Sequence, residues 1–233
     1  FHKLMRDEGM VDTDEPFTRL LSQGMVLAET FFRVQPDGRK DYFFPAEVAI
    51  QRDSKGRTVA ATLKADGRPV AVGGIETMSK SKNNGVDPTD LIGQYGADTA
   101  RLFMMFAAPP EQTLEWSDAG VEGAFRFLKR LWELGNKPEY QSALYPDTAA
   151  RRRLVQGFVW ESLSPDQRRL RGAVHGLLEQ ANRDFDKHQF NTVVAACMKM
   201  VNSLGQLPAA EHTGPEAAGN HAILFEAVDI LVR

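Results

Sequence analysis

Apolar residues recur at helical spacing through the second half of the chain, and this pattern constrains the fold more than any other feature. Residues at i, i+3, i+4 and i+7 share one face of an α-helix, so an apolar stripe at that spacing needs a covering element. Four such stripes lie between residues 120 and 233, and they predict a helix bundle with short polar connectors. They comprise Phe125, Leu128, Leu131 and Trp132; Leu170, Val174, Leu177, Leu178, Ala181 and Phe185; Val193, Ala196, Cys197, Met200, Val201 and Leu204; and the start of a fourth from Ile223 to Leu231.

The residues before this bundle alternate short β-rich runs with turns. Pro36-Asp37-Gly38 is one such turn, in which proline presets φ and glycine accepts a positive φ. We therefore expect a small β-rich insert over residues 31–75 of a mainly α chain, ending at Gly73-Gly74, two residues without a Cβ atom that are expected to form a hinge. Its expected strands are 31–34, 42–44, 48–50, 58–63 and 70–72; before it we expect a helix over 2–8 and a strand over 24–28.

A polar loop over residues 77–85 joins the insert to two expected helices. Asp87 is a natural N-cap and Pro88 a natural first residue for a helix ending at Gly96, and Pro109-Pro110 should stop a second helix over 97–107. The second helix carries a run of large apolar side chains that we expect in the core: Phe103, Met104, Met105 and Phe106. The loop offers cations and donors suited to the phosphates of a nucleotide, namely Ser79, Lys80, Ser81 and Lys82; the alternative is an ordinary solvated loop.

Composition excludes several classes of protein. With 233 residues, 42% of them hydrophobic and 25% charged, the chain is neither disordered nor collagen-like. The single cysteine, Cys197, cannot form an internal disulfide, and a reducing, cytoplasmic location is expected. The longest apolar run, 102–108, is far shorter than the ~20 residues that span a bilayer, and no His or Cys spacing suggests a metal site. Because the sequence opens on Phe1 and closes on an apolar helical pattern, we interpret it as a piece of a longer protein.

The mild net charge of −3 conceals a basic segment. Residues 124–187 hold 12 lysines and arginines against 8 acidic residues. Arg126, Lys129 and Arg130 fall at i, i+3 and i+4 of the first bundle helix, so they share one face, on which they could contact nucleic-acid phosphates. The alternative is a solvated helix face. Two other clusters suggest less: Arg151-Arg152-Arg153 in an expected connector, and Arg168, Arg169 and Arg171 near an expected helix start.

The polar loop resembles a known signature. Met78-Ser79-Lys80-Ser81 matches four of the five positions of the KMSKS motif of class I aminoacyl-tRNA synthetases, with Thr77 in place of the first lysine. The surrounding sequence is similar to leucyl-tRNA synthetases of the bacterial type. The segments that carry this similarity are 23–27, 81–88, 95–99, 101–107, 113–116, 120–124 and 126–130.

The resemblance implies a division of the chain and a reaction. Residues 1–30 would end a Rossmann-type catalytic core, 31–75 would be a leucine-specific insert, 76–119 the signature loop with stem-contact helices, and 120–233 an incomplete anticodon-binding-type bundle. The complete enzyme, expected to be a monomer, would activate leucine with ATP and Mg²⁺ and transfer it to the 3′ end of tRNA(Leu). The chain itself would bind no metal or membrane, and would need the remainder of its polypeptide for activity.

The same resemblance assigns roles to residues. Lys80 would stabilise the charge that develops on ATP in the transition state, and Met78, Ser79, Ser81 and Lys82 would complete the ATP and pyrophosphate site. Lys82 would partly replace the lysine missing at Thr77. Arg126, Lys129 and Arg130 would dock tRNA. Two alternatives stay open: a class I synthetase specific for isoleucine, valine or methionine, and a non-catalytic RNA-binding helical module.

Overall fold

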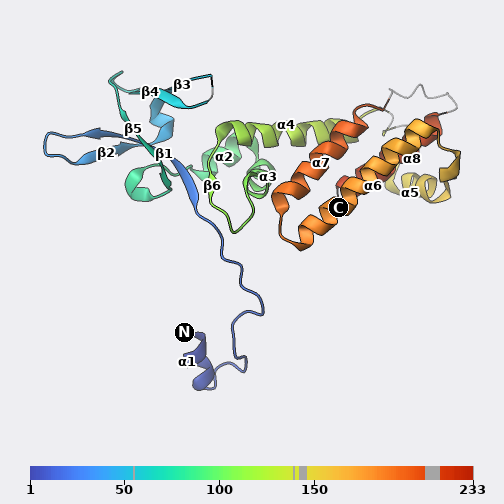
Figure 1. Cartoon of the computed structure of the whole chain (residues 1–233), viewed down its shortest axis with the longest axis horizontal. Coiled ribbons are helices and arrows are strands. Elements are labelled where there is room, and N and C mark those ends of the chain that lie inside the picture. The colour runs from blue at the N-terminus through green and yellow to red at the C-terminus, as the bar shows by residue number, and fades with distance from the viewer. Residues whose placement is uncertain (55, 139, 142–145, 208–215, 233) are drawn as a thin grey trace.

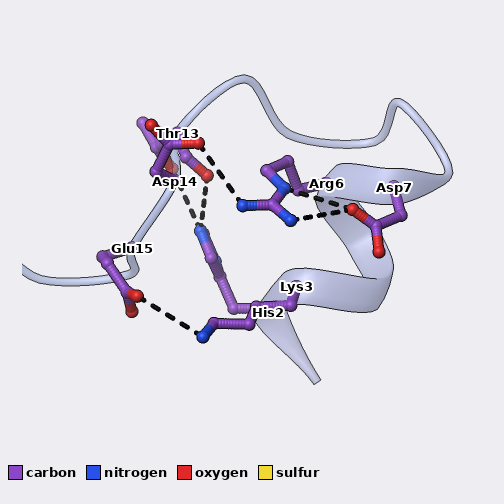
Figure 2. A network of polar contacts seen from close by, with 7 residues as sticks. All are labelled: His2, Lys3, Arg6, Asp7, Thr13, Asp14 and Glu15. Carbon is purple, nitrogen blue, oxygen red and sulfur yellow. Dashed lines mark hydrogen bonds and ion pairs between the residues drawn. The ribbon is translucent and has the colours of Figure 1, made fainter.

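The computed structural model describes residues 1–54, 56–138, 140–141, 146–207 and 216–232. A β-rich part and a helix bundle lie at opposite ends of the molecule, and three helices connect them (Figure 1). The short helix α1 (His2–Asp7) lies apart from both, at the end of an extended segment. Figure 2 shows how exposed polar side chains tie α1 to the residues after it: Lys3 pairs with Glu15, Arg6 with Asp7 and Asp14, and the His2 ring with the Thr13 carbonyl oxygen. None of the first 27 residues is buried, so these contacts are local.

One long strand organises the β-rich part. Strand β1 (Val26–Val34) pairs antiparallel with β2 (Lys40–Phe43) and β5 (Ala71–Thr77), and parallel with β6 (Leu114–Glu115). It is continuous through residue 30, where the expected catalytic tail meets the expected insert; the expected border at 75/76 likewise lies inside β5. Strands β3 (Val48–Arg52) and β4 (Thr58–Leu63) form a second sheet after the 3₁₀ turn Pro45–Glu47. Phe31, Val48, Ala61 and Val70 form the core of this part.

The expected hinge at Gly73-Gly74 is wrong, because both residues belong to β5. The register of β5 against β1 shifts between Thr30 and Phe31, and Gly73 is the extra residue opposite that step. A Cβ atom on Gly73 would lie 2.3 Å from Thr30 Oγ1, so glycine is required there by close packing. Gly74 adopts φ +88°, and its carbonyl oxygen accepts a hydrogen bond from Thr30 Oγ1 at 3.2 Å. The two glycines therefore shape a bulge in a paired strand.

The connecting helices begin and end where their local signals indicate. Asp87 accepts a hydrogen bond from the Thr89 amide at 2.7 Å and caps α2 (Pro88–Tyr95), and α3 covers Ala97–Ala107 as expected. Strand β6 and helix α4 (Asp118–Gly135) follow, and Phe103, Leu114, Val121 and Ala124 form the core between them. The expectation that Met104 and Met105 are buried is wrong: both side chains are exposed, because only the Phe103 side of α3 faces this core.

Four further helices complete the bundle: α5 (Thr148–Gly157), α6 (Pro165–Asp186), α7 (Phe190–Leu204) and α8 (Ala217–Leu231), with a 3₁₀ turn at Trp160–Ser162. Their shared core contains Leu134, Val174, Met200, Leu204 and Ile223, which confirms the main positions of the α6 and α7 stripes. Two positions of these stripes are wrong. Phe185, at the end of the α6 stripe, is exposed, and at the start of the α7 stripe Val194 is buried where Val193 was expected.

The expected stripe of α4 is partly wrong. Phe125 and Trp132 are 40% and 74% exposed, whereas Val121, Ala124, Phe127 and Leu134 are buried. The buried face changes along α4 because its first half packs on α3 and its second half on the bundle core.

The arginine run is also corrected, since Arg151, Arg152 and Arg153 lie in helix α5 rather than in a connector. Asp147 caps this helix by accepting a hydrogen bond from the Ala150 amide at 2.6 Å. The Arg151 guanidinium stacks over the Tyr140 ring at 4.1 Å, so Arg151 contributes to bundle packing. Among the described residues, no helix is long and apolar enough to cross a membrane.

Candidate functional site

The signature loop, residues 77–85, leaves the sheet at the end of β5. The Met78 amide donates to the Val26 carbonyl oxygen at 3.0 Å, which continues the β1–β5 pairing by one residue. Lys80–Lys82 then form a single 3₁₀ turn, and Asn83 adopts the left-handed conformation with φ +50°. The five positions expected to bind ATP and pyrophosphate, residues 78–82, therefore run from the last pairing residue beside β1 to the end of this turn.

A buried asparagine closes the signature loop. The Asn84 side chain is fully buried, and its Oδ1 accepts a hydrogen bond from the Ser79 amide at 2.9 Å. Its Nδ2 lies 3.2–3.3 Å from the carbonyl oxygens of Ala28, Glu76 and Thr77. One side chain thus joins the start of the turn to both strands beneath it.

The two lysines of the loop are held differently. The Lys80 side chain is exposed, and its ammonium makes no hydrogen bond or ion pair with any residue that the structure describes. Lys82 is half-buried and forms an ion pair with Glu76. The hydrogen bond that Lys82 Nζ donates to the Glu76 carboxylate raises the pKa of Lys82 above its ordinary value, although partial burial opposes the shift. Lys80 is therefore the cation free to meet an anionic ligand, and Lys82 would first have to leave Glu76.

The serine hydroxyls flank Lys80. Ser79 Oγ and Ser81 Oγ lie 3.3 Å apart, so one hydroxyl donates to the other. Asn83 Nδ2 donates to the Tyr42 carbonyl oxygen at 2.8 Å and connects the loop to β2. Asn84 and Glu76 are not among the predicted site residues; the only local signal for Asn84 is the polar Asn83-Asn84 pair within the loop.

The basic residues of α4 are all exposed. Arg126 pairs with Glu122 at 3.5 Å, and Arg130 Nη1 donates to Asn202 Oδ1 of α7 at 2.9 Å. The Lys129 ammonium makes no hydrogen bond or ion pair within the described ranges. The three cations are therefore exposed together, and Lys129 is the one whose charge no neighbour engages.

Other candidates prove to be structural. Arg171 binds Glu226 through two hydrogen bonds of 2.7 and 2.8 Å and stacks on Trp160 at 3.7 Å, so the arginines near the start of α6 partly serve the bundle. Trp116 packs against Phe103 with ring centroids 5.1 Å apart. Burial raises the pKa of the Cys197 thiol, which disfavours its thiolate form. The described residues contain no group of three or more His, Cys, Asp or Glu side chains that could hold a metal ion.

Comparison with known proteins identifies the family. The family model for class I tRNA synthetases (I, L, M and V) matches residues 71–117, from β5 through the signature loop to β6. A leucine–tRNA ligase of Aromatoleum aromaticum is 53% identical over 234 residues, which cover 100% of this chain and 25% of that protein. The chain belongs to the leucine–tRNA ligase family. A family member from Pseudomonas aeruginosa is 50% identical over 236 residues, again 100% of this chain and 25% of the relative.

The leucine–tRNA ligase family also provides a structural neighbour. The crystal structure of a LeuRS–tRNA–LeuAMS complex from Agrobacterium radiobacter K84 matches with a TM-score of 0.51 at 20% identity. The match covers 98% of this chain and 23% of that one, and it supports the fold. The chain spans about a quarter of the length of the curated leucine–tRNA ligases that it matches.

Proposed function

We propose that the complete protein carrying this chain is a leucine–tRNA ligase, and that this chain supplies the signature loop and helices that dock tRNA. The observation that carries the proposal is the 53% identity to a leucine–tRNA ligase along the whole chain. The signature loop within it presents an exposed Lys80 ammonium that has no partner among the described residues. The chain alone is expected to lack activity because it corresponds to a quarter of its relatives.

In leucine activation, a carboxylate oxygen of leucine attacks the α-phosphorus of ATP, and the bond to the bridging oxygen breaks as pyrophosphate leaves. Negative charge increases on the phosphate oxygens in the transition state, so an ammonium that engages them at that stage lowers the barrier. We assign this role to Lys80, because it is free of other partners in the loop. A hydroxyl of the tRNA 3′-terminal ribose then attacks the leucyl carbonyl carbon, and AMP leaves.

The neighbouring residues complete the proposed ATP and pyrophosphate site. The half-buried Met78 anchors the loop on the sheet, and the hydroxyls of Ser79 and Ser81 supply donors beside Lys80. Lys82 contributes a second cation once phosphate displaces Glu76. Magnesium would enter bound to ATP, since the described residues of this chain offer no ligand cluster for it.

Docking of tRNA(Leu) is the second part of the proposal. The exposed side of α4 presents Arg126, Lys129 and Arg130, and phosphate contacts need exposed cations of this kind. We further propose the division into a catalytic tail (1–30), insert (31–75), signature-loop and stem-contact part (76–119) and bundle (120–233). We also propose that the enzyme is a cytoplasmic monomer.

The test is amino-acid-dependent ATP–pyrophosphate exchange by the complete protein. Leucine should support exchange at least 100-fold more efficiently, as kcat/KM, than isoleucine, valine or methionine. Replacing Lys80 by alanine should lower kcat at least ~10-fold, the scale of one charge-assisted contact of about 1.5 kcal/mol or more. Absence of leucine-dependent exchange, or preference for another of the four amino acids, would overturn the proposed function.

A further inference from the structure

Asn84 differs from every other polar side chain of the signature loop, because it faces the protein interior. Its side chain is fully buried, and both ends of the amide are used: Oδ1 accepts from the Ser79 amide, while Nδ2 faces three carbonyl oxygens. These carbonyls belong to β1 (Ala28) and to the last two residues of β5 (Glu76 and Thr77). An amide is the side chain that presents an acceptor and a double donor in this space.

These bonds determine where the turn that bears Lys80 begins. The Ser79 amide would otherwise point into a loop that has no other acceptor for it among the described contacts, and an unpaired buried amide is unfavourable. The bond between the Ser79 amide and Asn84 Oδ1 closes residues 79–84 into a ring. Inside this ring, the Lys82 amide donates to the Ser79 carbonyl oxygen at 3.2 Å. Lys80 projects from this ring, one residue beyond the bond to Asn84.

We propose that Asn84 is a positioning residue for adenylate formation, which fixes the Ser79–Lys82 turn on strands β1 and β5 so that Lys80 meets the phosphates of ATP. The inference rests on the proposed function. Asn84 does not reach the ligand itself, because its side chain is enclosed by the loop and the strands. A residue placed 1 Å wrongly by a change elsewhere can cost about 10²-fold in rate, so loss of this anchor should be visible kinetically.

The experiment compares Asn84→Ala, Lys80→Ala and the double variant in the complete enzyme. Leucine-dependent ATP–pyrophosphate exchange gives kcat and the KM values for leucine and ATP. A separate assay measures the transfer of leucine from preformed enzyme-bound adenylate to tRNA. We expect Asn84→Ala to lower the exchange kcat at least 10-fold while the leucine KM and the transfer rate stay within 2-fold of the parent. The double variant should be no more than 2-fold slower than Lys80→Ala, because Asn84 acts through Lys80.

Asn220→Ala is the matched control. Asn220 is also a buried amide, 7% exposed, and accepts from Gln167 Nε2 at 2.8 Å in the bundle. Its replacement should lower the melting temperature without changing exchange more than 2-fold. If Asn84→Ala does not fold, Asn84→Asp serves instead, because it keeps the shape and the acceptor for the Ser79 amide while losing the Nδ2 donors. We expect Asn84→Asp to lower the exchange kcat at least 3-fold in the parent enzyme and to have no such effect in the Lys80→Ala variant.

Two results would overturn the inference. One is an Asn84→Ala exchange rate within 2-fold of the parent; the other is a loss that multiplies with that of Lys80→Ala, which would make Asn84 independent of Lys80. The proposed function fails separately, if the parent enzyme itself shows no leucine-dependent exchange.

Discussion

At the residue scale, the signature loop separates its two lysines by their partners. Lys80 is exposed and unpaired within the described chain, whereas Lys82 is held by Glu76 from the end of β5. Because Thr77 stands where the signature has its first lysine, Lys82 is the other cation of the loop that could replace it. The carboxylate of Glu76 competes with phosphate for that cation, because both would bind the same ammonium.

Replacing Glu76 by glutamine should therefore release Lys82 for ATP. We expect the KM for ATP in pyrophosphate exchange to fall about 2- to 5-fold with kcat unchanged, since the added contact strengthens ground-state and transition-state binding alike. The gain should disappear in the Glu76→Gln/Lys82→Gln double variant, which serves as the control. A higher KM for ATP in Glu76→Gln would instead mean that Glu76 is needed to hold the loop.

At the element scale, packing against neighbouring elements shapes the bulge of β5 and decides which side of α4 is exposed. The bulge in β5 fits against Thr30 and Phe32 of β1, and it directs the chain into the signature loop four residues later. On α4, the cations lie on the side that packing leaves free: Arg126 and Arg130 have polar partners, and Lys129 has none among the described residues.

Gly73→Ala should destabilise the sheet beneath the loop. The new methyl group would lie 2.3 Å from Thr30 Oγ1 and 2.8 Å from Phe32 Cε1, so the strands must separate locally, at a cost of about 1–3 kcal/mol. Hydrogen exchange of the β1 and β5 amides, measured in the complete protein, should accelerate accordingly. Gly93→Ala is the control: it lies in α2 with no atom within 4 Å of the added Cβ, and should stabilise that helix by about 0.5–1 kcal/mol. Unchanged exchange in Gly73→Ala would contradict the packing argument.

Charge reversal at Lys129 should weaken tRNA binding more than charge reversal at Arg126. Arg126 already shares its charge with Glu122, whereas Lys129 is available to a phosphate. We expect Lys129→Glu to reduce the slope of log K against log salt by about 1, as for one lost phosphate contact. Filter binding of tRNA(Leu) over a range of salt concentrations measures this slope. An unchanged slope for both variants would exclude direct phosphate contact by these residues.

At the scale of the whole molecule, stability is divided among three cores: one in the β-rich part, one where α3, α4 and β6 meet, and one in the bundle. In the bundle, Arg171 on α6 binds Glu226 on α8, 55 residues later in the chain, and stacks on Trp160 of the 3₁₀ turn that precedes α6. Burial raises the pKa of Glu226, but the hydrogen bonds and charges of Arg171 and His175 outweigh it, and the net shift is downward.

The bundle should consequently lose stability in acid. A carboxyl group whose pKa is lowered by folding contributes stability that is fully present above its unfolded pKa, here about 4.5, and is lost as pH falls through the folded value. We expect the melting temperature of the bundle to decrease as the pH is lowered from 4.5. In Glu226→Gln the share of this decrease that is due to Glu226 should be absent, and the free energy of unfolding at pH 7 should be lower by about 1–3 kcal/mol. Fluorescence of Trp160, in a variant with Trp116 and Trp132 replaced by phenylalanine, reports the transition. A parallel pH dependence in parent and Glu226→Gln would contradict this assignment.

The sequence alone determined the features that depend on near neighbours along the chain. Caps and turns use contacts between residues two to four apart, which is why the start of α2 at Asp87-Pro88 and the whole of α3 could be predicted to the residue. The signature loop was likewise recognisable from consecutive residues, and its family from the segments around it. Helical spacing predicted the bundle and most of the buried positions of α6 and α7.

Only the tertiary structure decided which of several apolar faces is covered and where polar side chains find partners. The buried face of α4 depends on α3 and on the bundle core, neither of which is encoded in the spacing of its own residues. Gly73-Gly74 form a bulge because β1, more than 40 residues earlier in the sequence, lies beside them. Asn84 is a buried anchor because its amide reaches Ala28, 56 residues away. Burial and hydrogen bonding between distant segments are properties of the assembled fold, so no local pattern can specify them.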